Sequence, residues 1–261
     1  DVPTCRRADV PTCRRADVLT AAKGQGMSTG AAMKEGPVCH RFTMLTHDEV
    51  EDVMRAIECG VRPEWEPDWP ARSPRDDAFP GASARIIAQG ASGGLASTDA
   101  VWGFSAPWAK RPVFNTRIET ALSPGGTMWS SAIAQGRCIV PAVRFFETQN
   151  RFGYDGPFEQ GAVGAKKRRN AYSFGMPDAA PVLLAGVRQD GRFSIVTTRP
   201  NENVAPVHDR MPLVLSWHEA WWWLGDGFAS LADRSGIALE ARLERRPLRP
   251  DASIGGQMSL F

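Results

Sequence analysis

The sequence predicts a single α+β domain in which antiparallel pairing of strands dominates. Its 261 residues are 43% hydrophobic, which is enough to bury one sizeable core. Short strand-like runs recur along the chain, whereas only two segments have a helical pattern. Gln189–Gly191 reads Gln-Asp-Gly between two of those runs, which is typical of a hairpin turn.

The expected elements begin with a helix over Thr46–Ile57. Thr46 and Glu49 have the spacing of a capping box, and Gly60 would end the helix. Residues 63–80 are rich in proline and tryptophan and predict an irregular surface loop. The strand-like runs that follow are Ala84–Ala88, Arg137–Val140, Val182–Val187, Arg192–Thr197 and Met211–Leu215.

Two later segments complete the expected organisation. Gly153–Asp178 is polar and glycine-rich and contains the basic run Lys166–Arg169, which predicts a solvated loop. The alternative is a flexible arm that contacts DNA phosphates. Ser216–Leu224 predicts a short helix with aromatic side chains on its buried side.

Composition limits the classes of function. The formal net charge is only +2, so binding to a nucleic acid would require a local basic groove. No apolar run is long enough to span a membrane. Cys39, Cys59 and Cys138 lack metal-ligand spacing, so we expect no metal, no cofactor and a reducing cytoplasm. Cys59 and Cys138 are expected to be small buried residues.

The start of the chain contains a short repeat. Residues Asp1–Ala8 recur at once as Asp9–Ala16, which is too short to build a packed unit. The segment also lacks the apolar core of a signal peptide. We expect residues 1–37 to be a disordered leader or an extension upstream of the true start, with Val38 read as the initiating GTG codon. A short natural propeptide is the remaining alternative. Residues 38–251 would form the domain.

Four separated segments contain reactive groups. These groups can act together only if the fold brings them into one pocket. They provide a thiol, a carboxylate, an imidazole, a carboxamide and three guanidiniums. This set suits nucleophilic and proton-transfer chemistry beside a phosphate-bearing substrate. The segments are Cys39–Thr43, Phe114–Thr120, Ile139–Glu147 and Pro206–Pro212.

In their order along the chain and in their residues, these segments resemble the motifs of the SOS response-associated peptidase family, whose members process abasic sites in DNA. The matching stretches are Trp102–Trp108 (WGFSAPW), Asn115–Thr120 (NTRIET), Arg137–Thr148 (RCIVPAVRFFET) and Thr197–Asn201 with His208–Pro212. The resemblance runs from residue 39 to about residue 225. It implies a curved, mostly antiparallel, barrel-like sheet flanked by short helices, acting as a monomer.

The resemblance also implies a mechanism. Cys39 would become the N-terminal residue and form a covalent thiazolidine link to an abasic site in single-stranded DNA. Glu147 and His208 would move protons. Asn115 would hold the cysteine or the sugar. Taken alone, His208 could instead be a structural histidine, and Glu147 could simply pair with Arg144 or Arg151.

DNA contacts are implied for two kinds of side chain. Arg41, Arg117 and Arg210 would grip phosphates. Phe42, Trp102 and Trp108 would stack against bases, although tryptophans are usually core residues. Glu119 is expected to be a structural partner for an arginine.

The chain departs from the family pattern at two places. His40 replaces the usual glycine after the cysteine, which adds bulk and a second imidazole at the mouth of the site. Thr148-Gln149 replaces the tryptophan that follows the glutamate.

The last residues, 252–261, predict a flexible tail. Gln257, Leu260 and Phe261 resemble the short peptide that binds the bacterial replication sliding clamp. An ordinary frayed terminus is the alternative.

Three functions remain open at this point. The first is covalent capture of abasic sites in the SOS response, in the cytoplasm and at the nucleoid when DNA is bound. The second is a cysteine autopeptidase that cleaves before Cys39. The third is a passive module that binds single-stranded DNA. Blocking the α-amine of Cys39 would separate capture from passive binding.

Overall fold

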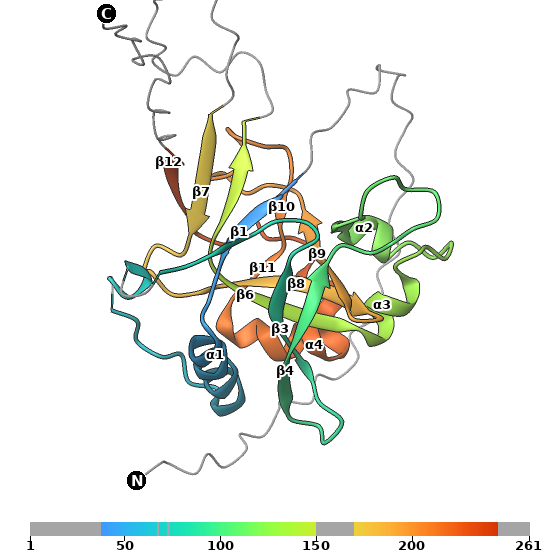
Figure 1. Cartoon of the computed structure of the whole chain (residues 1–261), viewed down its shortest axis with the longest axis horizontal. Coiled ribbons are helices and arrows are strands. Elements are labelled where there is room, and N and C mark those ends of the chain that lie inside the picture. Colours follow the sequence, from blue (N-terminus) through green and yellow to red (C-terminus); the bar gives the residue numbers. More distant parts are fainter. Residues whose placement is uncertain (1–37, 67, 72–73, 150–169, 245–261) are drawn as a thin grey trace, which may run out of the picture.

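Five strands close into a barrel at the centre of the molecule (Figure 1). The computed structural model describes residues 38–66, 68–71, 74–149 and 170–244. The barrel strands are β3 (Ser83–Gln89), β4 (Leu95–Trp102), β6 (Arg137–Thr148), β8 (Val182–Gln189) and β9 (Arg192–Thr198). Their order is β8-β9-β4-β3-β6, and pairing of β6 with β8 closes the ring. Only the β4–β9 pairing of the ring is parallel, which confirms the predicted fold class.

The long strand β6 belongs to the barrel and to a sheet that extends beyond it. Its first half, up to Ala142, pairs with β8. Its second half pairs with β1 (Arg41–Met44) on one side and β7 (Ala171–Gly175) on the other. β2 (Asp77–Ala78) continues past β1, and β12 (Glu240–Glu244) pairs with β7. The end of β6 is therefore flanked on both sides.

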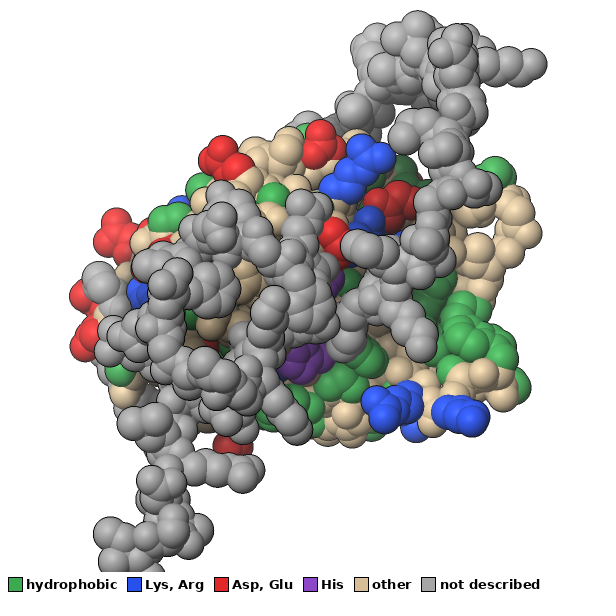
Figure 2. Space-filling model, turned by 90° about the horizontal axis from the view of Figure 1, so that it is seen from above, with side chains coloured by type: hydrophobic (Ala, Val, Ile, Leu, Met, Phe, Trp, Pro, Cys, Tyr) green, Lys and Arg blue, Asp and Glu red, His purple; other side chains and the backbone are tan. Residues whose placement is uncertain are grey.

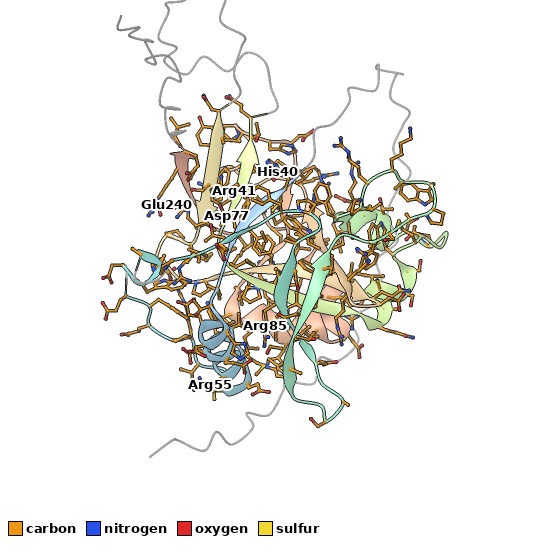
Figure 3. The ribbon with its side chains drawn as sticks, in the orientation of Figure 1. His40, Arg41, Arg55, Asp77, Arg85 and Glu240 are labelled. Atoms are coloured by element: carbon orange, nitrogen blue, oxygen red, sulfur yellow. The ribbon has the colours of Figure 1, made fainter. Side chains whose placement is uncertain are left out.

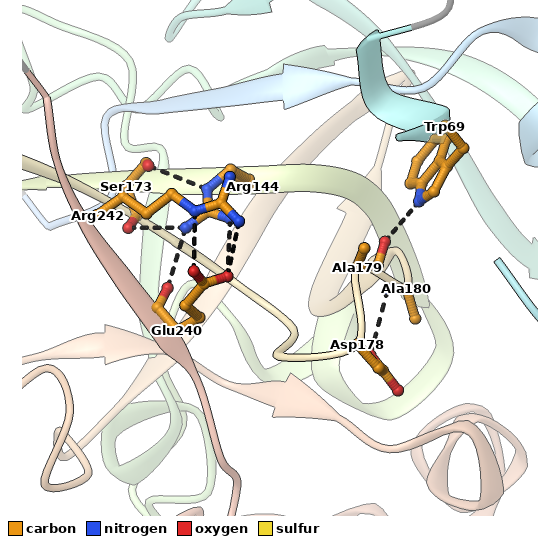
Figure 4. Close-up of polar contacts among 8 residues, drawn as sticks. All are labelled: Trp69, Arg144, Ser173, Asp178, Ala179, Ala180, Glu240 and Arg242. Atoms are coloured by element: carbon orange, nitrogen blue, oxygen red, sulfur yellow. Dashed lines mark hydrogen bonds and ion pairs between the residues drawn. The ribbon is translucent and has the colours of Figure 1, made fainter. Parts of the chain in front are cut away.

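Side chains tie this extension together. The guanidinium of Arg144 on β6 donates to Ser173 Oγ on β7 at 3.0 Å and to the carbonyl of Glu240 on β12 at 3.0 Å (Figure 4). Arg144 is thus held by β7 and β12.

Three short strands lie along β8 and β9. β5 (Asn115–Arg117) runs parallel to β9, with Asn115 opposite Ile195. β10 (Met211–Pro212) pairs with the last residues of β9, and β11 (Val214–Leu215) pairs with β8. β5 and β10 are distant in the sequence, but both pair with the last residues of β9.

Short helices surround the barrel. α1 (His47–Cys59) begins at the predicted cap Thr46, forms the predicted capping box with Glu49, and ends at Gly60 in the left-handed conformation (φ 65°). The other helices are α2 (Ile118–Ala121), α3 (Ser130–Gln135), α4 (Ala220–Leu224) and the 3₁₀ turns η1 (Trp69–Ala71), η2 (Trp217–Glu219) and η3 (Asp226–Leu231). No described helix is long and apolar enough to cross a membrane.

Alternation along the strands produces two cores. On β3, Ile86 and Ile87 are both buried but belong to different clusters, because successive strand residues point to opposite faces. One cluster is centred on Trp102, which stacks on Phe193 with centroids 6.1 Å apart, and this cluster also contains Cys39. The other packs Trp223 of α4 against the opposite face of the sheet.

Most strand predictions are confirmed, and the hairpin turn after β8 has positive φ at Asp190 and Gly191, as its sequence predicts. Several elements differ from expectation. The strand β7 lies within the predicted loop 153–178, and residues 63–80 contain η1 and β2. The strands β1, β4, β5 and β12 and the helices α2 and α3 were not predicted. Cys138 is buried, but Cys59 is only half-buried. Residues 1–37, Lys166–Arg169 and the tail 252–261 lie outside the described residues.

Candidate active site

Cys39 and Glu147 meet in the interior, at the start of β1 and the end of β6. The backbone N–H of Cys39 donates to Glu147 Oε1 at 2.8 Å. Antiparallel pairing explains this approach, because Arg41 is opposite Phe146 in the register of β1 and β6. Both Cys39 and Glu147 are 0% exposed. Cys39 also has φ 35°, a left-handed conformation that is costly for a residue with a side chain.

Burial controls the protonation of this pair. It raises the pKa of the Glu147 carboxyl well above its ordinary value, against the opposing effect of the Cys39 N–H. Glu147 Oε2 is buried and has no hydrogen-bond partner among the described residues. Burial also raises the pKa of the Cys39 thiol, and the neighbouring Glu147 adds to that rise. The site therefore favours a neutral carboxyl beside a neutral thiol.

Asn115 holds the other side of the same peptide bond. Its Nδ2 donates to the carbonyl oxygen of Val38, while its Oδ1 is buried without a partner in the described part of the chain. Asn115 is the first residue of β5, so its position is set by the parallel pairing with β9. The peptide group between Val38 and Cys39 is thus hydrogen-bonded at its carbonyl by Asn115 and at its N–H by Glu147.

His208 is held by the turn that precedes β10. Its Nδ1 accepts from the backbone N–H of Arg210 at 3.0 Å and lies 3.1 Å from Asp209 Oδ1. The opposite ring nitrogen, Nε2, makes neither of these contacts. Burial lowers the pKa of His208, although Asp209 opposes the shift, and the neighbouring His40 lowers it further. A neutral imidazole is therefore favoured near pH 7.

Arg210 and Arg41, which are predicted to bind phosphates, both bond carboxylates. Arg210 makes a bidentate pair with Glu119 at 2.8 and 2.9 Å and also donates to the carbonyl of Thr197. Arg41 bonds Asp77 at 2.7 Å (Nε to Oδ2) and lies over the ring of Phe146. Figure 3 shows Arg41 and Asp77 close to His40, far from Arg55. The pair between Arg210 and Glu119 confirms the prediction that Glu119 is the structural partner of an arginine.

The sequence matches a known protein family over most of its length. Residues 38–245 match the family described as SOS response associated peptidase (SRAP). The chain belongs to the SRAP family.

Relatives of this SRAP chain carry a shared name. The protein is 27% identical over 137 residues to abasic site processing protein YoqW of Bacillus subtilis, a match that covers 44% of this chain and 51% of YoqW. It is 31% identical to abasic site processing protein YedK of Escherichia coli over 47% of this chain and 52% of YedK. YoaM of Bacillus subtilis, with the same name, is 24% identical over 71% of this chain and 78% of its own length. The chain thus spans about half the length of YoqW and YedK.

Solved structures support the fold. A phage-related protein from Bordetella bronchiseptica superposes with a TM-score of 0.57 at 20% identity, over 80% of this chain and 95% of that one. A protein from Bacteroides thetaiotaomicron gives a TM-score of 0.52 at 19% identity, over 79% and 92% of the two chains.

The SRAP fold places two expected DNA contacts in the core. Phe42 is 1% exposed and Trp102 is 0% exposed, and their ring centroids are 5.0 Å apart. Trp102 also donates its indole N–H to the carbonyl of Phe114. Neither ring has a surface on which a base could stack, so the expectation that they contact DNA is corrected: both stabilise the barrel interior.

An exposed aromatic residue lies elsewhere. Trp108 is 71% exposed on the loop between β4 and β5, which Phe104 and Val113 close by a β-bridge. It lines a cavity of about 340 Å³ together with Phe104, Pro107, Met128 and Arg192. Lys110 and Arg111 follow it and are not buried. The sequence raised Trp108 only as one of several stacking candidates, because exposure is not encoded locally.

Further site residues were missed. Asp77 holds Arg41, and Asp209 lies against His208 and raises the pKa of Glu147. Asp209 is inside a matching motif and could have been found there, whereas nothing in the sequence around Asp77 signals its role.

The remaining expectations at the site concern Glu147 and metals. The suggested pairing of Glu147 with Arg144 does not occur, since Arg144 bonds Ser173 and Glu240. Arg151 lies outside the described residues. No group of three potential metal ligands occurs in the described ranges.

Proposed function

We propose that this protein captures abasic sites in single-stranded DNA through a covalent bond to Cys39, once Cys39 carries a free α-amine. The observation that carries the proposal is the buried contact of 2.8 Å between the Cys39 nitrogen and Glu147. It places a proton-transfer group directly on the atom that would attack the aldehyde of the opened sugar. The shared name of the SRAP relatives, abasic site processing protein, supports the same substrate.

The proposed chemistry proceeds in two balanced steps. The α-amine adds to the aldehyde, and loss of one water molecule gives a Schiff base. The Cys39 thiol then adds to the imine carbon while its proton passes to nitrogen, which closes a thiazolidine ring. No oxidant is needed. Only an N-terminal cysteine supplies both groups from one residue, so their proximity is built in.

Glu147 and His208 would divide the proton transfers. Once Cys39 carries a free α-amine, the positive charge of its ammonium form would favour the carboxylate of Glu147. This carboxylate would take the ammonium proton and return it to the departing hydroxyl of the carbinolamine. His208 would transfer a proton to the ring oxygen of the sugar during ring opening. It would use Nε2, because its Nδ1 accepts a hydrogen bond from the backbone N–H of Arg210. Asn115 would hold the group bonded to Cys39, as its Nδ2 now holds Val38.

Phosphate contacts would come from Arg117, which is exposed on β5, and from Arg41 and Arg210. Arg41 and Arg210 are paired with carboxylates, and Arg117 acts electrostatically on Glu119, so the net positive charge of this surface is reduced. On the uncovered part of the face in Figure 2, charges of both signs are scattered around histidine and apolar side chains. Trp108, with Lys110 and Arg111, would extend the surface by stacking a base.

Docking to the sliding clamp through Gln257, Leu260 and Phe261 remains a separate proposal. It rests on the sequence of the tail alone, because these residues lie outside the described part of the chain.

The test uses single-stranded DNA with one abasic site and protein that begins at Cys39. We expect an adduct that survives denaturing electrophoresis. Cys39→Ser is the matched control, because it keeps the amine but lacks the thiol that closes the thiazolidine. It should give an adduct only when borohydride reduces the Schiff base. A stable adduct with Cys39→Ser, or none with the unaltered protein, would refute the thiazolidine.

A second activity, self-cleavage before Cys39, is supported by the grip on the Val38–Cys39 bond. The thiol would add to the Val38 carbonyl carbon, whose oxygen receives the Asn115 N–H. The C–N bond would then break with a proton delivered to nitrogen beside Glu147, and water would hydrolyse the resulting thioester. The left-handed conformation of Cys39 (φ 35°) would favour rupture of the intact bond.

Self-cleavage is tested by following the mass of the purified full chain with time. Asn115→Ala should slow the appearance of a product that begins at Cys39, by about 100-fold if Asn115 stabilises the oxyanion. Asn203→Ala alters an asparagine outside this contact and serves as a control for general effects on the fold. Equal rates for Asn115→Ala and the unaltered chain would refute the role of Asn115.

A further inference from the structure

His40, the residue after the nucleophile, has an unsatisfied atom in the site. Its Nδ1 is buried and has no hydrogen-bond partner in the part of the chain that the structure describes. A buried polar atom without a partner costs about 1–3 kcal/mol, and native structures contain few of them. Such an atom beside Cys39 can form a hydrogen bond with a ligand bound there.

The surroundings of His40 define that partner. Burial and the adjacent Arg41 both lower the pKa of its imidazole, and His40 is near enough to His208 to lower the pKa of that ring. His40 is therefore neutral near pH 7, with one N–H and one lone pair. A neutral ring has no special advantage in binding phosphate, and Arg41 lies next to it for that purpose. A hydroxyl group, which both donates and accepts, suits either tautomer.

We propose that Nδ1 of His40 binds the C4′ hydroxyl group that forms when the abasic sugar opens. The proposal rests on the proposed function in taking an abasic site as the ligand. The closed sugar has only an ether oxygen at that position, so the contact selects the open form. The open form carries the reactive aldehyde, and holding its hydroxyl opposes ring closure. His40 is thus a binding residue that raises the fraction of reactive substrate.

The experiment compares two DNAs that cannot form a crosslink. One contains a borohydride-reduced abasic site, which is permanently open and has a free C4′ hydroxyl. The other contains a tetrahydrofuran residue, which is permanently closed. We expect the protein to bind the open DNA about threefold to tenfold more tightly, the range of one hydrogen bond.

Three variants locate the contact. His40→Asn places a polar atom near the position of Nδ1 and should keep the preference. His40→Gln reaches the position of Nε2 instead, and His40→Gly removes the ring, so both should weaken the preference and leave only the part that His208 contributes at the same oxygen. Thermal unfolding of each variant checks that the fold is intact.

The outcomes are decisive because neither DNA has an aldehyde. Equal affinity of the unaltered protein for the two DNAs, or binding of neither, overturns the proposal. An equal loss of affinity for both DNAs in His40→Gly also overturns it, since a phosphate or packing contact would behave in that way. Failure of covalent capture by Cys39 would refute the proposed function and leave this preference measurable.

Discussion

Glu147 combines two properties that oppose each other, complete burial and an ionisable side chain. Its carboxyl sits at the Cys39 nitrogen, where the proposed chemistry requires a proton acceptor. Burial, however, favours the protonated form, because a charged carboxylate loses its hydration there. This conflict should be visible in the stability of the protein.

We predict that Glu147→Gln, made in a Cys39→Ala chain that cannot cleave itself, becomes increasingly stabilising as pH rises. The folded state holds a proton on Glu147 above its ordinary pKa of 4.5, whereas the unfolded state releases it. The chain that has Glu147 therefore loses stability as pH rises from 4.5 toward the folded pKa, by about 1.4 kcal/mol per pH unit. The chain with glutamine does not lose it, because glutamine does not titrate. Urea unfolding at several pH values measures the difference between the two chains.

Glu119→Gln provides a control of opposite sign. The hydrogen bonds from Arg210 lower the pKa of Glu119, so its contribution is present above the ordinary pKa and is lost as pH falls. The substitution should destabilise the protein modestly near pH 7, because Glu119 is half exposed and solvent screens the pair. The same pH trend for both substitutions would contradict the assignment for Glu147.

At the residue scale, the sequence identified groups but not their surroundings. The prediction that Cys39, Asn115 and Glu147 lie together is confirmed, and pairing of β1 with β6 and of β5 with β9 brings them there. The roles of Phe42 and Trp102 could not be predicted, since strand register decides which face of the sheet a ring occupies. The pairing of Arg41 with Asp77 spans 36 positions and leaves no local pattern.

At the element scale, local signals were reliable where the backbone needs a particular residue. The turn between β8 and β9 illustrates this, with φ 51° at Asp190 and 68° at Gly191. β4 could not be recognised because its residues Leu-Ala-Ser-Thr-Asp-Ala-Val-Trp are mostly small or polar, and only the sixth and the last of them are buried. β7 pairs with β6, and β12 pairs with β7 at the edge of the extension, so strand pairing and not a hydrophobic pattern defines both strands.

We predict that Gly191→Ala destabilises the protein by about 1 kcal/mol. No atom lies near the added methyl group, so the whole cost arises from the left-handed backbone (φ +68°). Gly125→Ala is a matched control, because its added methyl group also meets open space but its φ is not in that region. Equal unfolding free energies for the two variants would contradict a tight turn at Gly191.

At the scale of the whole molecule, the barrel brings four distant segments to one site. Cys39 lies just before β1, Glu147 is on β6, Asn115 begins β5, and His208 lies in the turn before β10. The site is fixed by strands, but the surface that would receive DNA depends on exposed side chains of loops and edges.

We predict that Arg117→Gln weakens binding to single-stranded DNA and reduces the slope of log affinity against log salt by about 0.7, the effect of losing one phosphate contact. Arg55→Gln, on α1 and distant from His40 in Figure 3, removes the same charge from another surface. Binding titrations at several salt concentrations compare the two variants. An equal effect of both would place the DNA elsewhere.

The most direct test of the central claim is the intact mass of the full chain after incubation, alone and then with single-stranded DNA that carries one abasic site. The account predicts a product that begins at Cys39 and a stable DNA adduct on that product, lost in Cys39→Ala. An adduct that persists in Cys39→Ala, or a chain that begins at Cys39 and forms no adduct, would contradict it.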